Sequence, residues 1–174
     1  MPISNGLLKQ KIYFVTTGLY FAVLQLGYFL MLQLNVSSTY VTYMAVVLAW
    51  MTGTVTGLWW DKPGGMRFGI AGLVAYYAVY GLVSLIPFSL WVLPWAMFGV
   101  FVTGLWAGQF FVRYFHKLPK TDVLFFYENN GFILGLLITF IGFVYLGNAF
   151  IRFAPLLLGC LLVIEQQLLT KAQA

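Results

Sequence analysis

Charged residues are scarce in this sequence, and their scarcity decides the class of protein. Only 7% of the 174 residues are charged, and the nine lysines and arginines outnumber the four acidic residues. A soluble domain carries about 25% charged residues, because its outer surface must face water. The composition is instead 62% hydrophobic, and the mean hydropathy is +0.92. We therefore expect the outer surface to contact the lipid bilayer or other apolar protein.

Cysteine and histidine are almost absent, and this argues against several kinds of site. The single cysteine, Cys160, lies inside an apolar run, so the chain has no disulfide framework and no paired-cysteine metal motif. The single histidine, His116, sits in a basic loop without a second ligand nearby. Catalytic serine motifs and phosphate-binding glycine loops are missing too. The sequence thus predicts no catalytic residue, no metal, no cofactor and no enzymatic activity.

Apolar segments of about 20 residues predict transmembrane helices, because a helix satisfies all of its backbone polar groups internally. Six such segments can be drawn, separated by short polar or turn-forming stretches. The predicted fold is therefore an all-α polytopic membrane protein, with residues 1–174 forming a single transmembrane domain. The predicted spans lie near residues 12–34, 39–60, 68–88, 90–115, 123–147 and 150–169.

Basic residues predict the orientation of these spans. Lysine and arginine accumulate in cytoplasmic loops, and one side of the six-span arrangement holds eight of them, whereas the other holds only Arg152. We therefore expect both termini in the cytoplasm, in a plasma membrane such as the bacterial inner membrane. Because the net charge of +5 comes from short loops beside apolar spans, it predicts no nucleic-acid partner. The eight residues are Lys9, Lys11, Lys62, Arg67, Arg113, Lys117, Lys120 and Lys171.

Pairs of glycines four residues apart occur in three of the six spans. Such pairs leave a flat stripe on which a second helix can approach closely, so we expect a tightly packed bundle. After the first pair comes a charged turn, which resembles a loop motif of the major facilitator superfamily but equally fits a simple cytoplasmic turn. The pairs are Gly53 and Gly57, Gly104 and Gly108, and Gly131 and Gly135; the turn contains Asp61, Lys62 and Arg67.

Glu128 lies about five residues into its apolar span, partway toward the bilayer centre, and its neighbours Asn129 and Asn130 are polar. A carboxylate within a membrane span is costly unless it is paired or hydrated. Glu128 is interpreted either as a substrate- or proton-binding carboxylate or as a structural acid bonded to a loop cation or amide. Gln25 and Gln109 are further candidates for the same polar crevice. Glu165, near the cytoplasmic end of its span, is interpreted as structural.

Three of these motifs together resemble a known module. They are Gly53, Gly57 and Asp61; Gly104, Gly108, Phe110 and Phe111; and Phe125, Glu128, Gly131 and Gly135. The arrangement is similar to the six-helix membrane module of spermidine-synthase-like fusion proteins, itself similar to half of a major facilitator transporter. This chain departs from it in having Phe110-Phe111 where Phe-Pro is usual, and glutamate where aspartate is usual. The soluble synthase domain is absent, so no polyamine synthesis is expected.

Two functions follow as hypotheses. The first is a non-catalytic accessory or scaffold subunit that binds other subunits of a membrane complex. The alternative is a transporter-like half-bundle that acts as a homodimer with a polar crevice at Glu128. Two three-helix repeats of inverted topology would suit the second hypothesis, because secondary transporters are commonly built that way.

Overall fold

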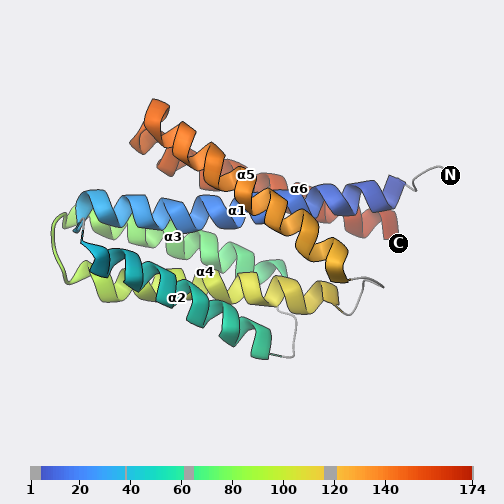
Figure 1. Cartoon of the computed structure of the whole chain (residues 1–174), viewed down its shortest axis with the longest axis horizontal. Coiled ribbons are helices and arrows are strands. Elements are labelled where there is room, and N and C mark those ends of the chain that lie inside the picture. The colour runs from blue at the N-terminus through green and yellow to red at the C-terminus, as the bar shows by residue number, and fades with distance from the viewer. Residues whose placement is uncertain (1–4, 38, 61–64, 116–120, 174) are drawn as a thin grey trace. The chain divides into compact units, whose positions relative to one another are not determined.

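A computed structural model describes residues 5–37, 39–60, 65–115 and 121–173 of the chain (Figure 1). All six helices in these ranges are long and apolar enough to cross a membrane. The predicted all-helical fold with six candidate spans is therefore confirmed. The helices are α1 (Asn5–Asn35), α2 (Tyr40–Trp59), α3 (Met66–Leu85), α4 (Val92–Phe115), α5 (Thr121–Leu146) and α6 (Asn148–Gln173).

Helix α3 ends three residues before the predicted span does. Its last residue is Leu85, and residues 86–88 form a turn. The cause is Pro87, because a proline disfavours helical geometry in the residue that precedes it, here Ile86. Phe88 adopts a positive φ of 61°, and its N–H donates a 2.5 Å hydrogen bond to the carbonyl of Asn35 at the end of α1.

The connection between α5 and α6 is a single glycine. Gly147 has φ +56°, a left-handed conformation that glycine adopts without strain. Its N–H donates to the carbonyl of Phe143 at 2.8 Å and so closes the last turn of α5. Helix α6 begins at the next residue, so the two helices form a tight hairpin.

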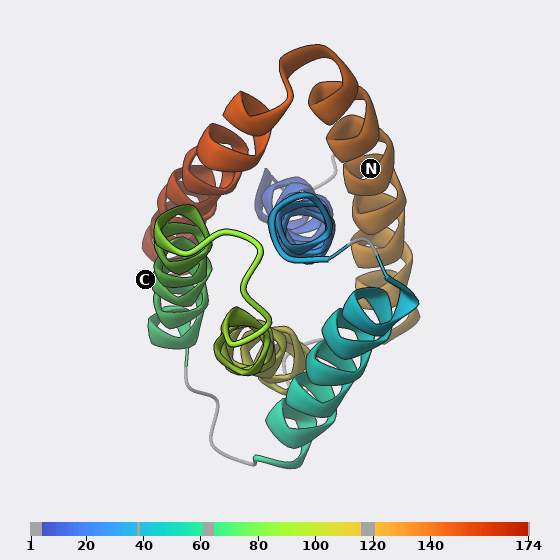
Figure 2. The ribbon, with the colours of Figure 1, turned by 90° about the vertical axis from the view of Figure 1, so that its left-hand side faces the viewer.

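The chain packs as two compact units, and the boundary between them falls within α1, after Val23. Unit 2 comprises residues 24–117. At its centre lies α4, with α2 packed on one side and α3 on the other (Figure 2). Tyr28, from the second half of α1, is fully buried, and its hydroxyl oxygen lies 3.2 Å from the hydroxyl oxygen of Thr103 on α4.

Unit 1 comprises residues 1–23 and 118–174. It combines the first part of α1 with the α5–α6 hairpin. The buried residues of α5 recur every three or four positions, which places them on one face of the helix. They are Leu124, Glu128, Gly131, Gly135 and Thr139.

The same contact scheme occurs once in each unit. In unit 2, Gly104 of α4 faces the carbonyl of Trp50 and the amide of Thr54 on α2. In unit 1, Gly18 of α1 faces the carbonyl of Glu128 and the amide of Phe132 on α5. Both pairs of partner residues are four positions apart, so the two interfaces share one register.

The partner glycines repeat this register from the other side. Gly53 and Gly57 of α2 face the carbonyls of Phe101 and Leu105 on α4. Gly131 and Gly135 of α5 face the carbonyls of Val15 and Leu19 on α1. Helices α1 and α4 are therefore counterparts, and so are α2 and α5. This is the pairing expected if α1–α3 and α4–α6 are two copies of one three-helix repeat.

Candidate functional site

The candidate site lies in unit 1, where α5 crosses α1 without intervening side chains. A Cβ atom on Gly18 would collide with the carbonyl of Glu128, and one on Gly131 would collide with the carbonyl of Val15. The two backbones are therefore in direct contact, and Glu128 lies at the contact itself. Glu128 as a whole is only 6% exposed.

Glu128 has no polar partner in the part of the chain that the structure describes. Among the residues that the structure describes, none forms a hydrogen bond or an ion pair with its carboxylate. The neighbouring lysine, Lys11 of α1, places its Nζ 5.1 Å from the centre of the Tyr127 ring. This cation therefore contacts the residue before Glu128 on α5.

An unpaired carboxylate at this position is unfavourable in its charged form. An acidic residue costs about 2.5–3.5 kcal/mol at the centre of a transmembrane helix, which is an upper value for Glu128 in the first third of α5. Most buried ionisable groups recover such a cost through partners, and Glu128 has none among the described residues. The arrangement therefore favours a Glu128 carboxylate that is neutralised by binding a proton or a cationic ligand.

The two asparagines beside Glu128 point elsewhere. Asn129 and Asn130 are both exposed, on the face of α5 opposite its buried stripe. The side-chain amide of Asn130 donates a 2.6 Å hydrogen bond to the carbonyl of Phe126, one turn earlier in the same helix. Neither asparagine joins the Glu128 carboxylate in a crevice.

The two candidate glutamines belong to the other unit. Gln109 of α4 is buried, and its Nε2 donates to the carbonyl of Gly57 at 2.7 Å and to that of Trp60 at 2.9 Å. These bonds satisfy backbone carbonyls at the end of α2, which lack partners within the helix. Gln25 is half-buried in the second part of α1. Glu128 thus belongs to unit 1, whereas Gln109 is a helix-capping residue of unit 2.

The cytoplasmic turn is described only in part. Asp61 and Lys62 lie outside the described residues, whereas Arg67 is exposed in the first turn of α3. The glycine pairs are described fully, and all six glycines lie against the backbone of another helix. Their tight packing fixes where Glu128 and Gln109 lie.

One further polar contact was not singled out from the sequence. The hydroxyl oxygen of Thr16 on α1 lies 3.1 Å from Oε1 of Glu165 on α6. The other carboxyl oxygen of Glu165, Oε2, is buried and has no hydrogen-bond partner among the described residues. The adjoining residues of α1 carry a sequence signal of a different kind, for the repeat and not for this contact. Thr17-Gly18-Leu19 matches Thr103-Gly104-Leu105 in α4, and both threonines donate to the carbonyl four residues earlier.

The repeat also shows what is particular to Glu128. By the shared register of the two interfaces, Glu128 of α5 corresponds to Trp50 of α2. Both residues are buried, Trp50 with 8% and Glu128 with 6% exposure. One copy thus fills this position with a large aromatic ring, and the other fills it with an acid. Comparison with known proteins adds no family, since no family model, no curated protein and no solved structure matches the chain significantly.

Proposed function

We propose that this protein is a transporter-like half-bundle of the plasma membrane in which Glu128 binds a proton or the cationic group of a substrate. The observation that carries the proposal is the carboxylate of Glu128, a buried residue at the α1–α5 contact, without a partner among the described residues. An ionisable residue inside a membrane span marks a functional site by default.

The repeated contact scheme supports the same proposal. A repeat of three spans must enter the membrane from opposite sides in its two copies, which gives an inverted repeat. Secondary transporters are commonly built from such repeats, with the binding site close to the interface between helices. The resemblance to half of a major facilitator transporter leads to the same architecture, and a homodimer would supply the second half.

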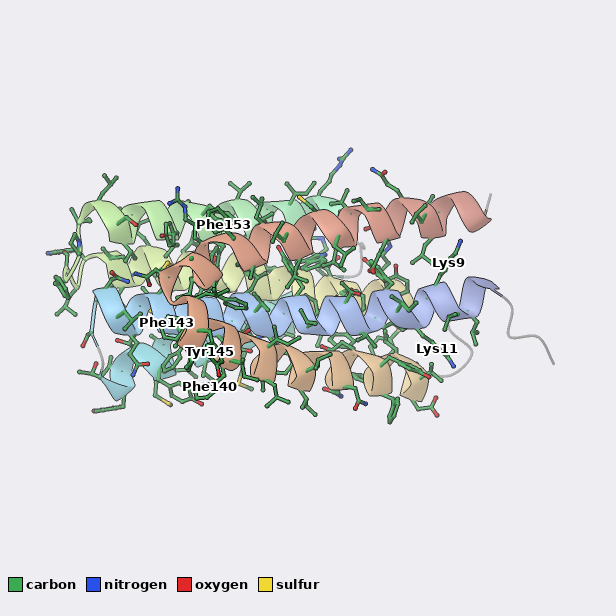
Figure 3. The ribbon with its side chains drawn as sticks, turned by 90° about the horizontal axis from the view of Figure 1, so that it is seen from above. Lys9, Lys11, Phe140, Phe143, Tyr145 and Phe153 are labelled. Carbon is green, nitrogen blue, oxygen red and sulfur yellow. The ribbon has the colours of Figure 1, made fainter. Side chains whose placement is uncertain are left out.

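The distribution of charges and aromatic rings supports an orientation with both termini in the cytoplasm. In unit 1, Lys9 and Lys11 lie at the start of α1, at the opposite end from the α5–α6 connection (Figure 3). Aromatic side chains gather around that connection, where an outer membrane interface would lie. The labelled ones are Phe140, Phe143, Tyr145 and Phe153 (Figure 3).

The proposal is tested with the proton itself as the ligand. The purified protein is reconstituted into liposomes on a solid-supported membrane, and the transient current after a pH jump is recorded. We expect a current that requires Glu128, because proton uptake by this carboxylate moves charge within the bilayer. Glu128→Gln, which keeps the shape and removes the titratable group, should lose most of that current.

Asp122→Asn is the matched control, since Asp122 is an exposed acid in the first turn of the same helix. Its current should equal that of the wild type. Equal currents from the wild type and Glu128→Gln would refute the proposed role of Glu128. Recovery of a stoichiometric foreign subunit, in native mass spectrometry of the gently extracted protein, would favour the accessory role instead.

A further inference from the structure

A second carboxyl group of unit 1 lies against α1. Glu165 of α6 and Thr16 of α1 are joined by a side-chain contact of 3.1 Å. Thr16 is two residues before Gly18, which faces α5. Two residues turn a helix by about 200°, so Thr16 lies on a different side of α1 from Gly18, which meets the Glu128 carbonyl.

The hydroxyl group of Thr16 has two acceptor oxygens within reach and one hydrogen. Its Oγ1 lies 3.1 Å from Oε1 of Glu165 and 3.1 Å from the carbonyl oxygen of Ile12. A hydroxyl group donates one hydrogen bond and accepts others, whereas a carbonyl only accepts. With an ionised Glu165, the single hydrogen of Thr16 would have to be shared between the two acceptors. Both contacts are full two-centre hydrogen bonds at the same time when Glu165 donates to Thr16 while Thr16 donates to Ile12. Glu165 can donate only as a neutral carboxylic acid.

The second carboxyl oxygen of Glu165, Oε2, also favours the neutral acid. Oε2 is buried and has no hydrogen-bond partner. An unsatisfied oxygen costs more free energy when it carries charge than when it belongs to a neutral acid. No described side chain forms an ion pair with Glu165; the charged side chains described elsewhere in this unit are Lys9, Lys11, Asp122, Glu128 and Arg152.

We infer that Thr16 and Glu165 form a second proton-binding site, in which neutral Glu165 donates through Oε1 to Thr16 and Thr16 donates to the Ile12 carbonyl. When the proton leaves to water, the Thr16 hydroxyl group rotates and donates its hydrogen to Oε1 instead. The proposed ligand is a proton, because these two side chains offer far fewer oxygen ligands than the roughly six that Ca²⁺ and Mg²⁺ require. This inference rests on the proposed function, since it gives the same half-bundle two protonatable sites.

The composition of the chain makes the site directly observable. Its four acidic residues are Asp61, Asp122, Glu128 and Glu165, so only two of them are glutamates. Protein labelled with ¹³C at the glutamate side chain therefore shifts two carboxyl bands in the infrared spectrum. In an ester-free detergent, we expect both at the frequencies of a protonated acid. Glu128→Gln should leave the Glu165 band, and Glu165→Gln should leave the Glu128 band.

The hydrogen bond is tested with threonine variants in the Glu128→Gln background. Thr16→Val removes the acceptor and should shift the Glu165 band to higher frequency, whereas Thr16→Ser should leave it in place. Thr17→Val is the matched control, because Thr17 is also buried and also bonds one turn back, but its hydroxyl bonds to the Tyr13 carbonyl. Gel filtration and circular dichroism establish that each variant is folded.

An ionised Glu165 band in the Glu128→Gln protein would overturn the inference, whether or not the Thr16 variants fold. So would a protonated band that Thr16→Val leaves unmoved. The two proposals fail separately. An ionised Glu128 band in the Glu165→Gln protein would contradict the proposed role of Glu128 and leave the Thr16–Glu165 site in place.

Discussion

Gln109 joins two helices through a single nitrogen atom. Its Nε2 donates to the carbonyls of Gly57 and Trp60, so replacement by leucine would leave two carbonyl groups at the end of α2 without this donor. Hydrogen bonds between membrane helices contribute about 0.6 kcal/mol on average and up to about 1.7 kcal/mol. Gln109→Leu should therefore lower the free energy of unfolding by about 1–3 kcal/mol, measured by steric trapping or titration with SDS.

Gln25→Leu provides the comparison for this change. Gln25 is half-buried in α1, and no hydrogen bond of its side chain is found among the described residues. The same substitution there removes the same amide group without breaking a bond between helices. It should change the unfolding free energy by less than about 0.5 kcal/mol. Equal losses from both variants would show that the Gln109 bonds contribute nothing measurable.

At the scale of single residues, the sequence shows which side chains are polar or ionisable, but not which groups surround them in the fold. The position of Glu128 within an apolar span could be predicted, because the segment around it is mostly apolar and the chain has only four acidic residues. Whether it had a partner was not readable, since this depends on which side chains α1 and α6 bring near it. The place of Glu165 near the cytoplasmic end of its predicted span favours a structural role, whereas its contact with Thr16 spans 149 positions of the chain. No local pattern predicts a contact of that kind.

Close packing at the scale of elements depends on glycines whose Cβ positions are occupied by backbone atoms. Gly131 of α5 is one of them, because a Cβ there would fall on the carbonyl of Val15. Gly131→Ala must separate α5 from α1. Overpacking of this kind costs about 1–3 kcal/mol. We expect a loss of unfolding free energy in that range, and a smaller pH-jump current because Glu128 moves with the helix.

Gly81 of α3 is the matched control for this substitution. It is also a helical glycine, but a Cβ at this position has no atom within 4 Å. Alanine favours a helix over glycine by about 1 kcal/mol, so Gly81→Ala should leave stability unchanged or raise it. A destabilisation by Gly81→Ala equal to that of Gly131→Ala would show that loss of glycine itself, and not the contact, is responsible.

The existence of the six helices was predictable because span length and hydropathy are local properties. The glycine pairs indicated close packing, but which helix each pair contacts is not a local property. Gly53 faces α4 and Gly131 faces α1, although both lie in the same kind of motif. The register of the two interfaces is seen in the structure, where Gly53 faces the carbonyl of Phe101 and Gly131 faces that of Val15. The sequence cannot predict these contacts, because every residue has the same backbone carbonyl.

At the scale of the whole molecule, six spans and the distribution of basic residues lead to a topology that can be measured. Both termini should be cytoplasmic, so residue 37 between α1 and α2 and residue 148 at the start of α6 should face outward. Asp122, at the start of α5, should face inward. Cys160, the one native cysteine, is exposed on α6 and is first replaced by alanine to give a background without thiols.

Single cysteines are then introduced as Ser37→Cys, Asn148→Cys and Asp122→Cys. A membrane-impermeant maleimide applied to intact cells should label the first two, and the third only after the membrane is opened. The physical reason is the cost of moving lysine and arginine across the bilayer, which fixes eight of the nine basic residues on one side. The reverse labelling pattern would place both termini outside. Outward labelling at residue 37 with inward labelling at residue 148 would mean an odd number of spans between them, and the inverted three-helix repeat could not then exist.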